Sequence, residues 1–273
     1  MKLFTFGDSW TEGVGANLSE ENQAEIPEER TLIRHNYCWP KKLSELIGCE
    51  FENNGVGSFS NNAIFNSITY KLKNGSITNK DFVAIMWSSS LRDDLPFFPN
   101  ENNFTIWGNR YKDKRHLFKY IFDGIDSVNT RYNRVEKDFR DYYIKNLFTD
   151  SYYDIVNQNY ILYLQFAFKQ LGIKYIFCDA FDTMISKHID DTIDKSYLID
   201  DIHYWGYKEK TFVDFLINLN RRDIWEDGYY WEKSTAGKHP SDIGYKLIAE
   251  ELYQYILTNN LLDDNQIKNS NLI

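Results

Sequence analysis

Cysteine is scarce in this sequence, and its three cysteines do not form a disulfide framework. Cys38, Cys49 and Cys178 cannot all pair within one chain, and no two of them form a Cys-x-x-Cys motif. This usage favours a reduced, intracellular setting. His35 and Cys38 have no further metal-ligating residues at a useful spacing, so we expect them to be structural, with no metal and no cofactor.

Long hydrophobic runs are also missing. No apolar stretch approaches the ~20 residues that a membrane-spanning helix needs. The N-terminus has no basic segment followed by an apolar core, which is the pattern of a secretory signal peptide. We therefore expect a soluble protein with no membrane partner, either cytoplasmic or carried on a virus particle.

The sequence also lacks an excess of positive charge. The chain has 31 Lys and Arg against 40 Asp and Glu, which gives a formal net charge of −9. Such a balance argues against the phosphate-led binding of nucleic acid. Hydrophobic residues make up 42% of the chain and aromatic residues 17%, enough for a substantial core, so a disordered or fibrous chain is excluded.

Short apolar runs alternate with helical patterns along the chain. Four runs are read as strands, at residues 2–6, 50–53, 82–87 and 174–179. The last two are nearly continuous apolar segments, as expected for parallel strands covered on both faces. Helical patterns occupy residues 39–47, 61–73, 154–171 and 241–257. This alternation predicts an α/β fold with a central parallel sheet and right-handed crossovers.

One region interrupts the alternation. Residues from about 93 to 153 are dense in aromatic and charged side chains, and a connection of this length is usually functional. We expect a single domain over residues 1–262, in which this large insertion forms a lid or cap over the sheet. A second polar excursion spans roughly residues 182–231, and residues 263–273 have the composition of a frayed tail.

Polar and small residues follow the predicted strands, where an open α/β sheet binds its ligands. The first strand is followed by Gly7-Asp8-Ser9, the second by a segment rich in glycine, serine and asparagine at residues 53–62, and the third by residues 88–92. His239, followed by Pro240, precedes the last helix. Ser9 is therefore a candidate nucleophile, with His239 as the base that a serine hydroxyl requires.

These segments resemble the SGNH, or GDSL, hydrolase family. Phe-Gly-Asp-Ser-x-Thr-x-Gly at residues 6–13 is similar to the first block of that family, Asn-x-Gly-Val-Gly-Ser at residues 53–58 to the second, and His-Pro-Ser at residues 239–241 to the last. The resemblance covers about half of the chain and leaves out the insertion. It implies a flavodoxin-like three-layer α/β/α sandwich and a serine ester hydrolase that forms an acyl-Ser9 intermediate.

The resemblance also implies which groups hold the oxyanion. The backbone N–H of Ser9 is one donor, and a second comes from the backbone near Gly57 or Ser58. The family takes a further donor from an asparagine in its third block, but this chain has Ser88, Ser89 and Ser90 there. A hydroxyl from Ser89 or Ser90 is the replacement we expect.

The acid of the triad is the second departure from the family pattern. The family places an aspartate three residues before the histidine, and this chain has Ala236 at that position. His239 is then oriented either by a backbone carbonyl, which leaves a Ser–His dyad, or by a carboxylate from elsewhere, such as Asp227 or Glu232. The sequence does not decide between these arrangements.

Four further residues are expected to support the site. Asp8 braces the loop that carries Ser9, Asn53 and Gly55 form the tight exit of the second strand, and Arg92 either binds an acidic substrate group or pairs with a neighbouring aspartate.

Three functions fit the sequence. The leading one is hydrolysis of short acyl (O-acetyl) esters, with a small-molecule or carbohydrate ester as substrate. A binding or structural protein with weakened catalysis is the alternative, and an acyltransferase using the same serine is another. The oligomeric state is left open.

Overall fold

The computed structural model describes residues 1–57, 59–89, 93–96, 118–121, 150–184, 194–225 and 239–263. The expected insertion at about 93–153 and the expected tail at 263–273 lie largely outside these residues. Of the insertion, the structure describes a two-stranded antiparallel sheet, β4 (Asp93–Pro96) with β5 (Phe118–Ile121), and the first turn of the helix α7 (Asp150–Leu171).

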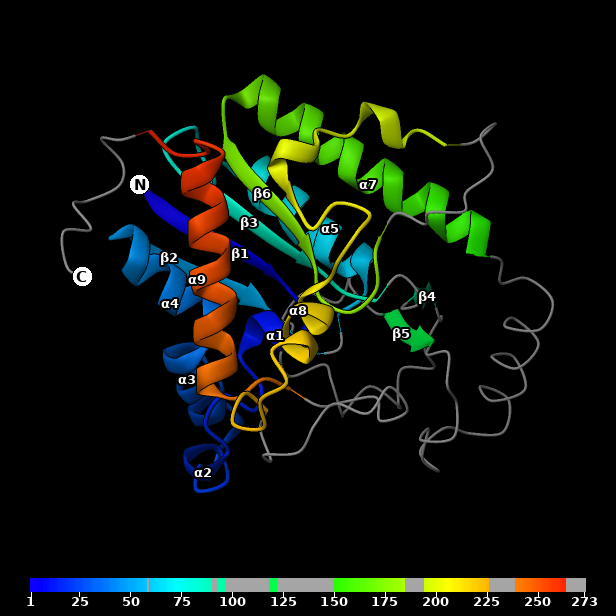
Figure 1. Ribbon diagram of the computed structural model, residues 1–273. Helices are drawn as coiled ribbons and strands as arrows, with labels where there is room; N and C mark the ends of the chain where they lie inside the picture. Colours follow the sequence, from blue (N-terminus) through cyan, green and yellow to red (C-terminus); the bar gives the residue numbers. More distant parts are fainter. Residues whose placement is uncertain are drawn as a thin grey trace, which may run out of the picture.

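Over the residues that the structure describes, the central sheet has five parallel strands in the order β2-β1-β3-β6-β7 (Figure 1). Their bounds are β1 Lys2–Gly7, β2 Glu50–Gly55, β3 Phe82–Trp87, β6 Lys174–Asp179 and β7 Tyr204–Trp205. Counted within the sheet, this is the flavodoxin-like order 2-1-3-4-5, in which the direction of winding reverses at the first strand. The carboxyl ends of β1 and β3 therefore border the place where such a fold binds its ligand.

Burial on both faces explains why β3 is apolar throughout. Its six residues are all buried. Phe82, Ala84 and Met86 join the core on one side of the sheet, and Val83, Ile85 and Trp87 join the core on the other side. A strand between two helical layers has no polar face, so the α/β class with a parallel central sheet is confirmed.

Helices cover both faces of the sheet (Figure 1). The core on one side includes residues of α1 (Ser9–Glu12), α4 (Trp39–Ile47), α8 (Phe212–Asn218) and α9 (Asp242–Thr258). The core on the other side includes residues of α5 (Asn61–Lys73) and α7. Two further helices, α2 (Leu18–Glu21) and α3 (Pro27–Tyr37), lie between α1 and α4 in the chain, and α3 buries none of its side chains.

The predicted helices at 39–47 and 61–73 have the bounds that the sequence indicated. Proline near the start of α4 and Gly48 in the left-handed conformation after its end are the signals that fixed it. Helix α7 begins four residues before the expected start. The sequence indicates no particular element in the second polar excursion, and its described part contains β7 and α8.

The three cysteines are free thiols. In the part of the chain that the structure describes, no helix is both long and apolar enough to cross a membrane.

Two glycines at the strand ends let α1 lie directly on the sheet. A Cβ atom at Gly7 would stand 2.0 Å from Thr11 Oγ1, and one at Gly55 would stand 2.4 Å from the backbone N of Glu12. Gly7 and Gly55 are partners in the β1–β2 register, so both strands make room for the same helix. Any side chain at either position would displace α1, and Ser9 with it.

We expect Gly55→Ala to lower the free energy of unfolding by about 3 kcal/mol, because the new methyl group meets backbone atoms that cannot rotate away. Urea denaturation followed by circular dichroism measures this. Gly75→Ala is the matched control: its Cβ has open space, and only its positive φ of +73° is strained, so its cost should be about 1 kcal/mol. Equal costs for the two variants would contradict the close packing of α1.

Candidate active site

Ser9 is the first residue of α1, two residues after the end of β1. It is 8% exposed, so its side chain lies in a largely enclosed place at the carboxyl edge of the sheet. The chain turns from strand to helix here because Asp8 caps the helix: its Oδ1 accepts a hydrogen bond from the Trp10 backbone N–H at 3.0 Å. This turn brings the Ser9 hydroxyl to the edge of the sheet.

His239 lies against Ser9, although 230 positions separate them in the sequence. The distance from His239 Nε2 to Ser9 Oγ is 3.0 Å, within hydrogen-bond range. When the neutral imidazole carries its proton on Nδ1, Nε2 accepts the serine proton. The structure thus brings together the two residues that the sequence indicated as nucleophile and base.

The segment after His239 is held in place by the chain before α9. Pro240 forms a β-bridge with Trp225, and the backbone N–H of Ser241 donates to the carbonyl of Ile224 at 2.9 Å. Ser241 then caps α9, where its hydroxyl accepts from the N–H of Gly244. These contacts fix the backbone next to His239 independently of Ser9.

A set of buried hydrogen bonds joins the loop of Ser9 to the end of β3 and to the start of α5. Asp8 is fully buried, and its Oδ2 accepts a hydrogen bond from Ser88 Oγ at 2.8 Å, just after β3. The Ser88 backbone N–H donates to Asn61 Oδ1 at 2.8 Å, at the start of α5. Asn61 Nδ2 in turn donates to the carbonyls of Ser88 and Ser89. Asp8 therefore contacts structural partners, and Asn61, which the sequence reading did not single out, orients the end of β3.

Asn53 and Gly55 bind the exit of β2 to α1. Asn53 Nδ2 donates to the carbonyl of Thr11 at 2.7 Å, and Asn53 Oδ1 accepts from the backbone N–H of Gly55 at 2.8 Å. The asparagine side chain thus spans from the strand to the helix that begins with Ser9. Both residues are placed where they shape the site without reaching its reacting atoms.

Gly57 is one of the expected oxyanion donors, and in this structure its backbone N–H donates to Glu12 Oε2 at 2.5 Å. Glu12 is 2% exposed and lies one helical turn after Ser9. The sequence reading overlooked this residue, and its position one turn from the candidate nucleophile was the available signal.

Glu12 belongs to a network of buried charges. Glu12 Oε1 accepts from Arg34 Nη1 at 2.7 Å, and Glu21 Oε2 accepts from Arg34 Nε at 2.9 Å. Burial lowers the pKa of Arg34, but the charges and hydrogen bonds of the two carboxylates outweigh it and raise this pKa above its ordinary value. Arg34 is therefore a cation at neutral pH.

Several candidates cannot be placed. Ser58, Ser90, Arg92, Asp227 and Glu232 lie outside the described residues. Of the two serines expected as oxyanion donors after β3, Ser89 is described and is partly exposed, and Ser90 lies outside the described residues. The partner that orients His239 and the remaining oxyanion donors therefore stay predictions.

Asp179 is a titratable group at the same sheet edge that the sequence reading did not use. It ends β6 beside Trp87, the last residue of β3, and is 1% exposed. Burial raises its pKa to about 8, against hydrogen bonds from the Tyr204 hydroxyl at 2.6 Å and from the Met184 backbone N–H. At neutral pH this carboxyl is mostly protonated.

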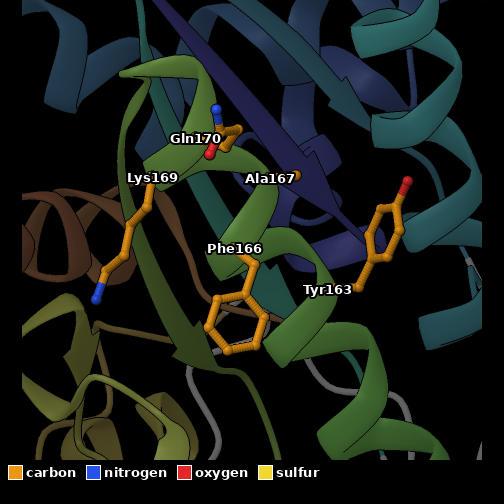
Figure 2. A pocket seen from close by; sticks show the side chains of 5 residues that line it. All are labelled: Tyr163, Phe166, Ala167, Lys169 and Gln170. Carbon is orange, nitrogen blue, oxygen red and sulfur yellow. The ribbon is translucent and has the colours of Figure 1, made fainter.

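A hollow lies on the outer surface of α7 (Figure 2). Its lining side chains all come from this one helix: Tyr163, Phe166, Ala167, Lys169 and Gln170. None of them is a serine, a cysteine, a histidine or a carboxylate, so the hollow lacks the pairing of hydroxyl and imidazole found at Ser9. Among the described residues, no cluster of three or more His, Cys, Asp or Glu side chains could hold a metal ion.

The raised pKa of Asp179 predicts a pH dependence of stability. Between about pH 4 and pH 8 this carboxyl is ionised in the unfolded chain and protonated in the folded one, so the folded state binds more protons and loses stability as the pH rises. Relative to the wild type, Asp179→Asn should gain about 1.4 kcal/mol of unfolding free energy per pH unit.

Urea denaturation at pH 5, 6 and 7 tests this, with Asp194→Asn as the control. The pKa of Asp194 is lowered by hydrogen bonds from Ser196 and by the charge of Lys208, so it does not titrate in this range. Parallel stability profiles for the wild type and Asp179→Asn would contradict the prediction.

Comparison with known proteins gives structural neighbours alone. No protein-family model and no curated protein matches the sequence. The chain is similar to a solved structure of a putative lipolytic protein of the G-D-S-L family from Desulfitobacterium hafniense DCB-2, with 15% identity, a TM-score of 0.39 and coverage of 96% of this chain and 99% of the other. It is also similar to a member of the lipolytic protein G-D-S-L family from Veillonella parvula DSM 2008, with 14% identity, a TM-score of 0.40 and coverage of 94% and 97%. Both neighbours bear the name of the family whose blocks this sequence resembles.

Proposed function

We propose that this protein is a serine ester hydrolase in which Ser9 is the nucleophile and His239 is the general base. The observation that carries the proposal is the 3.0 Å distance between His239 Nε2 and Ser9 Oγ at the carboxyl edge of the sheet. A serine hydroxyl becomes a useful nucleophile when a base within hydrogen-bond reach accepts its proton. The two neighbours described as lipolytic proteins are consistent with this reaction class but do not carry it.

The proposed reaction has two halves. Ser9 Oγ bonds to the acyl carbon while its proton passes to His239 Nε2. The tetrahedral intermediate then collapses: the bond to the leaving alkoxide breaks, His239 returns the proton to it, and an alcohol departs. Water attacks the acyl-Ser9 ester in the same way, with His239 as base, and releases the carboxylic acid and the free serine.

The oxyanion needs hydrogen-bond donors. The backbone N–H of Ser9 is at the start of a helix, where N–H groups have no carbonyl within the helix to bond. Ser58, Ser89 and Ser90 are the other donors that we propose. Loss of one such donor costs about 10²–10³ in rate in other hydrolases, so the absent asparagine of the third block predicts a slow enzyme.

The substrate class that we propose is a short acyl ester, with O-acetylated carbohydrates as the first to try. It rests on the family resemblance of the sequence. An acyltransferase would form the same acyl-Ser9 intermediate and pass the acyl group to a sugar hydroxyl in place of water.

A fluorophosphonate probe tests the activated serine directly. We expect the purified protein to be labelled, and we expect Ser9→Ala and His239→Ala to lower both labelling and hydrolysis of p-nitrophenyl acetate by at least about 10³-fold. Ser76→Ala and His203→Ala are matched controls on other elements and should react as the wild type does.

Two results would overturn the proposal. One is a folded wild-type protein that neither reacts with the probe nor hydrolyses any ester. This result would favour a binding protein built on the same fold. The observation that supports this alternative is that the backbone N–H of Gly57 already donates to Glu12. The other is hydrolysis that survives Ser9→Ala undiminished.

A further inference from the structure

Arg34 stands at the centre of a polar network that ends at two glycine backbone amides, those of Gly57 and Gly15. Its guanidinium donates to Glu12 through Nη1 and to Glu21 through Nε. Each carboxylate uses its other oxygen to accept from a glycine amide: Glu12 from Gly57 at 2.5 Å, and Glu21 from Gly15 at 3.0 Å. One cation therefore holds the loop after β2 and the loop after α1.

The Gly57 branch reaches the reacting group. A Cβ atom at Gly57 would lie 3.0 Å from Glu12 Oε2 and 4.0 Å from the Cβ of Ser9, so this part of the loop lies beside the candidate nucleophile. Shifts of about 1 Å in an active site can cost about 100-fold in rate. The position of the Gly57 amide therefore bears directly on the geometry around Ser9.

Helix α3, which supplies Arg34, contributes little to the core, because none of its side chains is buried. The side chains of the ion-paired residues are largely buried: that of Arg34 is 16% exposed, and those of Glu12 and Glu21 are 3% and 6% exposed. A buried ion pair is weak evidence for stability, because desolvation offsets most of its attraction. What the pair does supply is a fixed geometry.

We propose that Arg34, acting through Glu12, is a positioning residue that fixes the Gly57 amide and the loop after β2 relative to the Ser9 hydroxyl. The proposal rests on the ester hydrolase function of Ser9 for its effect on rate. The claim that Arg34 and Glu12 fix the Gly57 amide does not depend on that function, because the hydrogen bond of this amide can be measured without any substrate.

The test uses Glu12→Gln, which keeps the size of the side chain, and Arg34→Met, which keeps its apolar stem. Both should lower kcat for p-nitrophenyl acetate by about 10- to 100-fold and leave KM within about threefold. The pH profile of kcat/KM should keep its shape, because neither variant touches the Ser9–His239 pair. Glu21→Gln breaks the other branch and should cost less than threefold.

Glu52→Gln is the matched control for a purely structural effect. Glu52 is a partly buried carboxylate that binds two cations, Lys2 and Lys71, in the middle of β2. It should lose stability with no change in kcat. A kcat of Glu12→Gln equal to that of the wild type, or a fall that Glu52→Gln reproduces, would overturn the proposal.

Amide hydrogen exchange separates this proposal from the proposed function. Exchange at Gly57 should become at least 10-fold faster in Glu12→Gln and in Arg34→Met than in the wild type, while amides of β3 keep their protection. If Gly57 exchanges at the wild-type rate, the positioning role is wrong even if the enzyme is active. A different result is faster exchange at Gly57 in the variants when neither the wild type nor any variant hydrolyses an ester. The structural role of the network is then correct, but the hydrolase function and the effect on rate are both wrong.

Discussion

The close packing of α1 on the two glycines at the ends of β1 and β2 is the constraint from which the site follows. Neither Gly7 nor Gly55 has room for a single methyl group, because atoms of α1 occupy that space. A helix that lies so close to the sheet has its first residue, Ser9, fixed relative to the strands. The nucleophile proposed here therefore takes its position from backbone packing, which is more rigid than a side-chain contact.

Buried polar groups then tie the neighbouring strand ends to this helix. Asp8, Ser88 and Asn61 form a chain of hydrogen bonds across the ends of β1 and β3 and the start of α5. Asn53 and Glu12 do the same for the exit of β2. Such groups are costly to bury unless each finds a partner, so a change in one of them disturbs several. The carboxyl edge of the sheet behaves as one connected unit.

The sequence predicted the parts of this structure that have a local signal. The continuous apolar runs of β3 and β6 indicated buried parallel strands, and a capping proline and glycine marked α4. β7 has only two residues and α3 buries no side chain, so neither shows a periodic pattern. At the site, residue type and place in the chain indicated Ser9 and His239. The hydrogen bond between Glu12 and Gly57 joins residues 45 positions apart, and no local pattern reports it.

The two borders of the described sheet have a consequence for how this protein behaves in concentrated solution. An exposed edge strand is a template on which a strand of another molecule can pair. β7 offers only Tyr204 and Trp205 along one border, which is too short for a stable ladder. β2, at the other border, carries Glu50 and Glu52, and Glu52 is paired with two lysines. The charged residues of β2 and the short length of β7 both discourage edge-to-edge association. The sheet that carries the site is therefore protected from pairing with strands of other molecules.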